Sequence, residues 1–467
     1  MYDLLLLASL IFFAGIATAY LRHPAASLMH PATFYLAFHG FLFVIRPIFA
    51  RIYDFNFVYR LYDFQPSMDD KITVILAANL ALVVFVCTAL YTARQPPMPI
   101  AREEYSRARA LLSQPIIVVS LALAPLAIWS QLANWGRRQA EFGTMIRDAA
   151  TGTAINTENI GWLTDASLLL APLTVMLIWL ARFRWWSWGY FALFILLQAG
   201  DGTRGPIVFA AAALGIAALL EHGRKWFDWR ATVLAIAALF AFSQLVLDRG
   251  AGLRSAVGQS DGVAYAGGAD LAPLEGMDFA NLEYFEYVVY AVPQRSGTYD
   301  YFASNLQIFT EPVPRALWKD KPAGSPIKNF SLWDYGRPIG MTASLPGAGW
   351  LSLGYIGVVI QTLAFALLYA LGYRYFLQRK GTPLAQLAYA LLIATAFNVL
   401  RDGTLLTFVR QLPFYLGPLV FVLLALRVLG PSRQAQAQAG QGPVREFLAQ
   451  SPAERRRNLA RRGPDQR

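Results

Sequence analysis

Residues 72–93 read ITVILAANLALVVFVCTALYTA, an apolar run that contains no charged side chain. A helix needs about 20 such residues to cross the hydrocarbon core of a bilayer. Comparable runs recur along the chain, for example at 115–134, 206–220 and 351–373. This stretch therefore predicts a membrane-spanning helix, and its recurrence predicts an all-α polytopic membrane protein.

The composition of the whole chain agrees with this prediction. Of the 467 residues, 56% are hydrophobic and only 15% are charged, and the mean hydropathy is +0.40, which excludes an ordinary soluble enzyme. The net charge of +11 does not indicate nucleic-acid binding, because the basic residues fall in short inter-helix loops and in the C-terminal tail. A single cysteine, Cys87, excludes an intramolecular disulfide and a cysteine-built zinc site.

The apolar runs divide the chain into four parts. We predict about 11 transmembrane helices. Their expected ranges are 4–20, 33–49, 72–93, 115–134, 162–180, 185–199, 206–220, 229–247, 351–373, 384–400 and 414–429. The parts are an N-terminal transmembrane block (1–247), a large polar loop that contains amphipathic helices (248–348, the polar segment), a C-terminal block of three spans (349–429) and a basic tail predicted to be disordered (430–467).

Charge sets the expected orientation. Loops dense in arginine and lysine alternate with loops that are not, and by the positive-inside tendency the basic ones are cytoplasmic. The basic loops are 93–113, 182–184, 223–230, 374–380 and the tail after 427. The segments expected on the outer side, together with the N-terminus, are 46–71, 135–161, 200–204, the polar segment and 401–410.

Two short turns on the predicted outer side carry arginines suited to an anion. Asp201-Gly-Thr-Arg204-Gly205-Pro206 starts a span, where backbone N–H groups and a guanidinium can hold phosphate. Arg401 and Arg410 flank a second turn with Asp402, and two guanidinium groups can bridge a diphosphate. The alternatives are a hairpin turn whose arginine reaches the headgroups, and an ordinary Arg–Asp surface pair.

The polar segment supplies further candidate cations. Prolines at both ends of 312–322 discourage a long helix there. A later run of small residues, 344–350, would let the backbone approach a ligand. The candidates for diphosphate binding in this segment are Arg315, Lys319, Lys321 and Arg337. Ordinary solvated loop charges and a flexible helix entry are the alternatives.

Candidate catalytic acids are Glu283, Glu286 and Asp402, because transfer to a hydroxyl requires a group that accepts its proton. The two glutamates share one face of a predicted amphipathic helix on the membrane surface, in which Tyr284, Tyr287 and Tyr290 are candidates for stacking on sugars. The alternative is a lid with a packing role. No nucleotide-binding loop occurs, and the four histidines fall on the cytoplasmic side or within a span, so we expect neither a histidine base nor a metal site.

Several short motifs, in order along residues 28–428, resemble the bacterial oligosaccharide repeat-unit polymerases, the Wzy-like proteins of O-antigen and exopolysaccharide assembly. These motifs are His30-Pro-Ala-Thr-Phe, Gly202-Thr-Arg204-Gly205, Pro314-Arg315 with Lys321-Pro322, Pro346-Gly through Gly349 to Gly354-Tyr-Ile-Gly357, and Arg401-Asp-Gly403.

The resemblance implies a GT-C-like fold in the bacterial inner membrane with an active site facing the periplasm. It implies metal-independent glycosyl transfer between undecaprenyl-diphosphate-linked oligosaccharides, without a cofactor. It also implies membrane lipids, a chain-length regulator and a flippase as partners. Arg204, Arg315, Arg401 and Arg410 would stabilise the leaving diphosphate, and one of the three acids would take the proton.

Other classes of protein stay open at this point. An O-antigen ligase performs the same chemistry on a different acceptor, but an outer-facing histidine would be expected of it and none occurs. A flippase or another transporter of lipid-linked glycans also needs arginines around a diphosphate, although it would place charges at mid-span. A structural assembly protein would not need arginines from several distant segments.

Overall fold

The computed structural model of the protein describes residues 1–61, 64–141, 146–147, 154–155, 163, 165–199, 205–230, 233, 274–275, 279–310, 313, 318 and 342–429. Apart from two paired two-residue strands, β1 (Ile146–Arg147) and β2 (Ala154–Ile155), the regular elements in these ranges are helices. Of the polar segment, the described part includes the helices α13 (Asn281–Ala291) and α14 (Ala303–Thr310).

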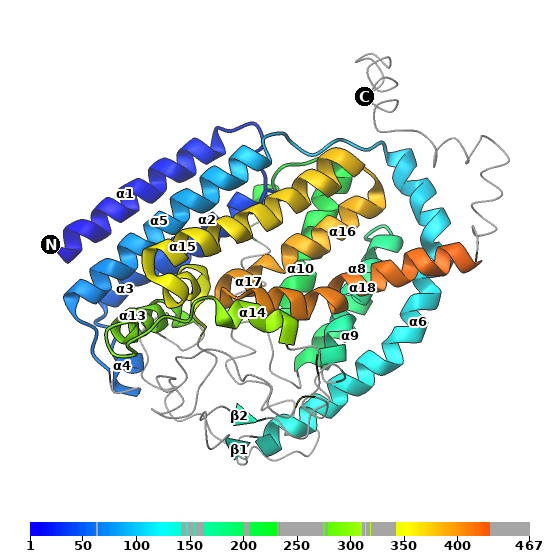
Figure 1. The fold of residues 1–467 in the computed structure, drawn as a ribbon. Coiled ribbons are helices and arrows are strands. Elements are labelled where there is room, and N and C mark those ends of the chain that lie inside the picture. Colours follow the sequence, from blue (N-terminus) through cyan, green and yellow to red (C-terminus); the bar gives the residue numbers. More distant parts are fainter. Residues whose placement is uncertain are drawn as a thin grey trace.

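Figure 1 shows the helices of the two membrane blocks, coloured along the sequence. In the N-terminal block they are α1 (Tyr2–Leu21), α2 (Pro31–His39), η1 (Gly40–Ile45), α3 (Arg46–Ile52), α4 (Phe57–Leu61), α5 (Met68–Thr92), α6 (Arg102–Glu141), η2 (Ala166–Leu169), α8 (Leu170–Leu180), η3 (Trp185–Ser187), α9 (Trp188–Ala199) and α10 (Gly205–His222). In the C-terminal block they are α15 (Ser344–Tyr373), η7 (Arg374–Lys380), α16 (Pro383–Ala394), α17 (Ala396–Asp402) and α18 (Leu405–Leu429).

Eight helices or continuous helical runs among the described residues are long and apolar enough to cross a membrane. They are Tyr2–Leu21, Pro31–Ile52, Met68–Thr92, Arg102–Asn134, Gly205–His222, Ser344–Lys380, Pro383–Asp402 and Leu405–Leu429. Each contains most or all of one predicted span, so the prediction of an all-helical, multi-pass membrane protein is confirmed. Of the other three, 162–180 corresponds to the shorter apolar helix Ala166–Leu180 and 185–199 to the 12-residue α9, whereas 229–247 lies almost wholly outside the described residues.

Small side chains allow the principal helix pairs to approach closely. Helix α5 packs along α15 and buries Ala77, Ala78 and Ala81, and α10 packs along α16 and buries Ala210 and Ala213. Small buried residues such as alanine let helix backbones come together in a membrane, where no water drives association. Figure 1 shows α1, α5 and α15 running side by side along one flank, with α6 on the other.

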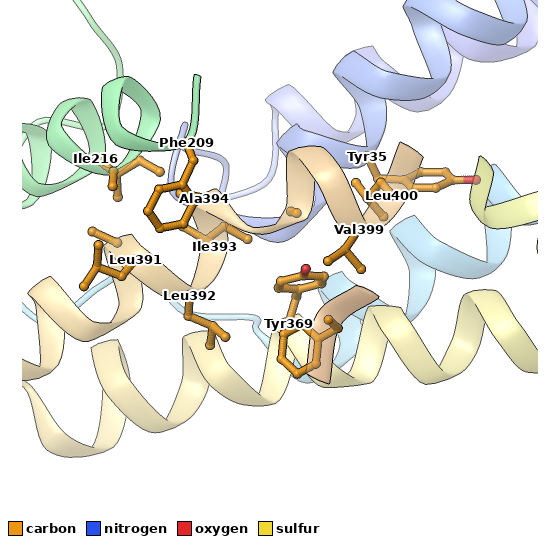
Figure 2. Packing of buried hydrophobic residues seen from close by; sticks show 14 of the residues in the cluster. Tyr35, Phe209, Ile216, Tyr369, Leu391, Leu392, Ile393, Ala394, Val399 and Leu400 are labelled. Carbon is orange, nitrogen blue, oxygen red and sulfur yellow. The ribbon is translucent and has the colours of Figure 1, made fainter. Parts of the chain in front are cut away.

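The centre of the bundle is α16 and α17. Figure 2 shows Leu391 to Ala394 of α16 between Phe209 and Ile216 of α10 and Tyr369 of α15, with Val399 and Leu400 of α17 beside them. The run Pro383–Asp402 is the most buried of the eight candidate spans. The end of α17, which carries Arg401 and Asp402, is therefore fixed by the surrounding helices.

Helix α15 is two helices joined at a sharp bend. Leu353 and Gly354 leave the helical conformation, and Gly354 has a φ of +57°. Beyond the bend the chain doubles back, so that a Cβ on Gly349 would lie 2.6 Å from the Cα of Val358. The small residues at 344–350 thus permit a close approach of the chain to itself.

The loops gather at two ends of the bundle. At one end the N–H of Leu28 donates to the carbonyl of Lys225 (2.9 Å), and the N–H of Met98 donates to that of Leu377 (3.0 Å). These contacts join loops predicted on the basic, cytoplasmic side. At the other end α13 contacts both α3 and the end of α17, which joins segments predicted on the opposite side.

Candidate functional site

Glu283 of α13 forms a buried ion pair with Arg46 at the start of α3. The Nη2 of Arg46 lies 2.7 Å from Oε1 of Glu283 and its Nε lies 3.0 Å from Oε2. Arg46 also donates to the carbonyl of Leu274, and neither side chain of the ion pair is more than 2% exposed. Because both carboxylate oxygens accept from this guanidinium, the role of Glu283 is structural: it holds α13 against α3.

Glu286, the other acid of α13, lies in a second polar contact. The Tyr59 hydroxyl of α4 donates to its carboxylate, and the Lys71 ammonium lies 4.8 Å from the centre of the Tyr59 ring. Burial raises the pKa of Glu286 to about 7, against the opposing effect of Lys71. The carboxyl can therefore exchange its proton near neutral pH.

A dependence of stability on pH follows from this pKa. The pKa of Glu286 is raised from its ordinary value of 4.5 to about 7, so its contribution to stability is complete below pH 4.5 and is lost as pH rises to about 7. We expect the free energy of unfolding to fall by roughly 3 kcal/mol across that window, and Glu286→Gln to remove this part of the slope. Melting temperatures in detergent from about pH 4 to pH 8 measure it. Exposed Glu103→Gln is the control, and equal slopes in wild type and Glu286→Gln would contradict the prediction.

The three tyrosines of α13 have different surroundings. Tyr287 is buried against Phe64 with ring centroids 5.2 Å apart. Tyr284 and Tyr290 are partly exposed, and the Arg295 guanidinium lies 3.3 Å from the Tyr290 ring centre. The helix is buried on nearly all sides rather than lying on a surface with its tyrosines outward. Of the three rings, Tyr284 and Tyr290 are thus the partly exposed ones, and Arg295 covers one face of Tyr290.

Arg401 and Asp402 end α17 at a turn that Gly403 makes possible. Gly403 has a φ of +78°, and its N–H donates to the carbonyl of Val399 (2.7 Å). The Nε of Arg401 lies 3.5 Å from Oδ1 of Asp402, and their side chains are 38% and 26% exposed. Among the described residues neither of these two atoms has a hydrogen-bond partner. The turn thus presents a cation and an anion that are only loosely paired.

Arg410, on the first turns of α18, is paired with an acid that the sequence had not marked. Its Nε lies 2.6 Å from Oδ2 of Asp165, which directly precedes η2. The arginine is 49% exposed, so the guanidinium can still reach a ligand. Asp165 is the acidic residue at the start of the predicted span 162–180, and a charge in an apolar run was the signal available.

The remaining predicted cations, Arg204, Arg315, Lys319, Lys321 and Arg337, lie outside the described residues. The residue after Arg204 is described. A Cβ on Gly205 would lie 3.3 Å from Oδ1 of Asn398 in α17. The start of α10 therefore meets the helix that ends in Arg401 and Asp402.

Arg109 belongs to helix α6 and not to the predicted basic loop at 93–113. Helix α6 begins at Arg102, and Arg109 is buried within it. Its Nη1 donates to Glu221 of α10 (2.8 Å) and its Nε donates to the carbonyl of Trp179 in α8 (2.8 Å). These bonds tie three helices together, which is a structural role.

Within the described ranges, no three His, Cys, Asp or Glu side chains come together as metal ligands. No protein-family model, curated protein or solved structure matches the chain. The fold defines a multi-pass helical membrane protein. At one end of its bundle, Arg401 and Asp402 adjoin the acidic helix α13, and Arg410 of α18 forms a separate ion pair with Asp165.

Proposed function

We propose that the protein polymerises undecaprenyl-diphosphate-linked oligosaccharide repeat units at the outer leaflet of the bacterial inner membrane. The observation that supports this most is the position of Arg401 and Asp402. They are partly exposed at the end of a buried span, with Arg410 on the next helix. Exposed guanidinium groups at the end of a membrane helix suit a diphosphate attached to a membrane-embedded chain.

The reaction would join two lipid-linked glycans. A sugar hydroxyl of the incoming unit bonds to the anomeric carbon of the growing chain, and the bond from that carbon to the diphosphate oxygen breaks. Arg401 and Arg410 offset the charge that develops on the departing diphosphate. The hydroxyl proton passes to a carboxylate.

Asp402 is the carboxylate best placed to take that proton. It is 26% exposed beside Arg401, and the Thr407 hydroxyl holds its Oδ2 at 3.2 Å. Glu283 is bound to Arg46, and Glu286 is only 2% exposed. In this proposal the two glutamates fix α13, and Asp402 acts as base.

Replacing Arg401 or Arg410 by alanine is expected to reduce polymerisation by about a hundredfold, because each substitution removes a cation that would stabilise the departing diphosphate. Surface polysaccharide should fall to single repeat units while the protein level is unchanged. Gel profiles of the glycans from a deletion strain carrying each variant measure this. The matched control is Arg51→Ala, which removes an arginine from an exposed ion pair with Asp3. Long chains persisting in both variants would show that the arginines do not serve the diphosphate.

The glycans that accumulate in the deletion strain distinguish the alternatives. Single lipid-linked units on the outer leaflet indicate a polymerase, and single units retained on the inner leaflet indicate a flippase. Long chains that stay on the lipid carrier indicate a ligase.

A further inference from the structure

Two buried carboxamides hold the backbone of the turn between α17 and α18. Asn305 of α14 and Gln361 of α15 donate to each other, with both nitrogen–oxygen distances at 3.1 Å. Gln361 also donates to the carbonyl of Gly403 (2.6 Å), and Asn305 accepts from the N–H of Leu405 (2.8 Å). The pair therefore fixes the backbone on both sides of Thr404.

A third carboxamide reaches the same turn from α13. The Nδ2 of Asn281 lies 3.2 Å from the carbonyl oxygen of Arg401. It also lies 2.8 Å from the carbonyl oxygen and 2.7 Å from the hydroxyl of Thr342. We call Asn281, Asn305 and Gln361 the carboxamide cluster, and all three are buried.

Burial of these three carboxamides would be unfavourable if they did not form hydrogen bonds with the turn. An unpaired buried carboxamide costs free energy, and more so beside a membrane-spanning helix, where water is scarce. Gln361 lies within the candidate span Ser344–Lys380. A fully bonded polar cluster in a low-dielectric interior rigidifies the groups it joins. Here those groups are the carbonyls of Arg401 and Gly403 and the N–H of Leu405.

The side chains of the turn contrast with its backbone. The backbone is held from α13, α14 and α15, whereas Nε of Arg401 and Oδ1 of Asp402 have no hydrogen-bond partner among the described residues. A rigid backbone that carries partly exposed charged side chains, here 38% for Arg401 and 26% for Asp402, is the arrangement that electrostatic preorganisation requires, because no reorganisation is then needed when charge develops.

We propose that the carboxamide cluster consists of positioning residues that hold Arg401 and Asp402 in register for the diphosphate of a lipid-linked glycan. This inference rests on the proposed polymerase function. It gives the described part of the polar segment a specific task, since α13 and α14 supply two of the three carboxamides.

The test combines a structural and a catalytic readout on the full-length protein in detergent. Hydrogen exchange of a peptide covering 401–407 is measured in wild type, Asn305→Ala and Gln361→Ala. Polymerisation is measured with the lipid-linked glycans extracted from the deletion strain. Asn305→Ala is also made in an Arg401→Ala background, and the double variant Asn305→Gln, Gln361→Asn exchanges the two amides. Asn79→Ala, which removes a carboxamide bound to Ser9, is the control.

We expect exchange at 401–407 to accelerate on the order of tenfold in Asn305→Ala. Polymerisation should fall by about tenfold to a hundredfold, with no further loss in the Arg401→Ala background. The double variant Asn305→Gln, Gln361→Asn should restore part of the polymerisation activity. The control Asn79→Ala should change neither hydrogen exchange nor polymerisation.

Unchanged exchange at 401–407, or an equal loss of activity in both backgrounds, overturns the positioning role. Faster exchange with undiminished polymerisation overturns it as well and leaves the polymerase proposal intact. If the wild type does not elongate the extracted glycans, the polymerase proposal is wrong and the positioning role falls with it.

Discussion

Replacement of Arg46 by methionine is expected to destabilise the protein by about 3–5 kcal/mol, because it leaves a buried carboxylate without a partner. Glu283 is 2% exposed and both of its oxygens accept from the Arg46 guanidinium. The carbonyl of Leu274 would lose its donor as well. Thermal unfolding in detergent, followed by the fraction that still elutes as a monodisperse peak, measures the loss.

The double variant Arg46→Met, Glu283→Leu separates the charge from the packing. Removing both partners of a buried ion pair is often nearly neutral, so most of the lost stability should return. Arg51→Met, in an ion pair whose side chains are 62% and 67% exposed, should cost less than about 1 kcal/mol. If Arg46→Met unfolds at the wild-type temperature, the ion pair does not hold α13 in place.

Gly403→Val is expected to abolish polymerisation and to destabilise the protein by more than about 2 kcal/mol. Gly403 has a φ of +78°, a conformation that side chains resist. A Cβ added at this position would also collide with the carbonyl oxygen of Ser344 and lie 2.9 Å from Cβ of Ala348. The turn would have to move, and the bonds from Gln361 and Asn305 would be lost with it. Thermal unfolding and the glycan profile of the complemented deletion strain provide the two measurements.

Gly223→Val is the matched control for this substitution. Gly223 has a φ of +64°, but the space around its missing Cβ is open. The two variants share the backbone strain and differ in the collision with Ser344 and Ala348. If Gly403→Val destabilises the protein no more than Gly223→Val does, the turn can accommodate the added side chain and the prediction is wrong.

Membrane spans could be read from the sequence because hydropathy over about 20 residues is a local property. The range 33–49 was predicted as a span, and the structure gives the helical run Pro31–Ile52. The turn at Arg401 was equally visible, since glycine after a charged pair ends a helix. The predicted spans 162–180 and 185–199 correspond to the apolar helix Ala166–Leu180 and to α9, which are shorter than the eight candidate spans among the described residues.

The partners of the candidate residues could not be read in the same way. Glu283 lies 237 residues from Arg46, and Arg410 lies 245 residues from Asp165. Asn281, Asn305 and Gln361 carry no charge and fit no motif, so nothing in the sequence distinguishes them from other polar residues. Arg109 looked like a loop arginine because its partner Glu221 belongs to a distant helix.

The sequence by itself determined that this protein is a helical membrane protein and that arginines and acids stand in the turns between its spans, because both follow from residues close together in the chain. Only the tertiary structure decided which of those charges are neutralised in buried ion pairs and which are partly exposed. Glu283 pairs with Arg46, whereas Arg401 and Asp402 are loosely paired on a backbone held by three distant carboxamides. The physical reason is that a charge takes its role from what lies within a few ångströms of it, and in a helical bundle those neighbours come from distant parts of the chain.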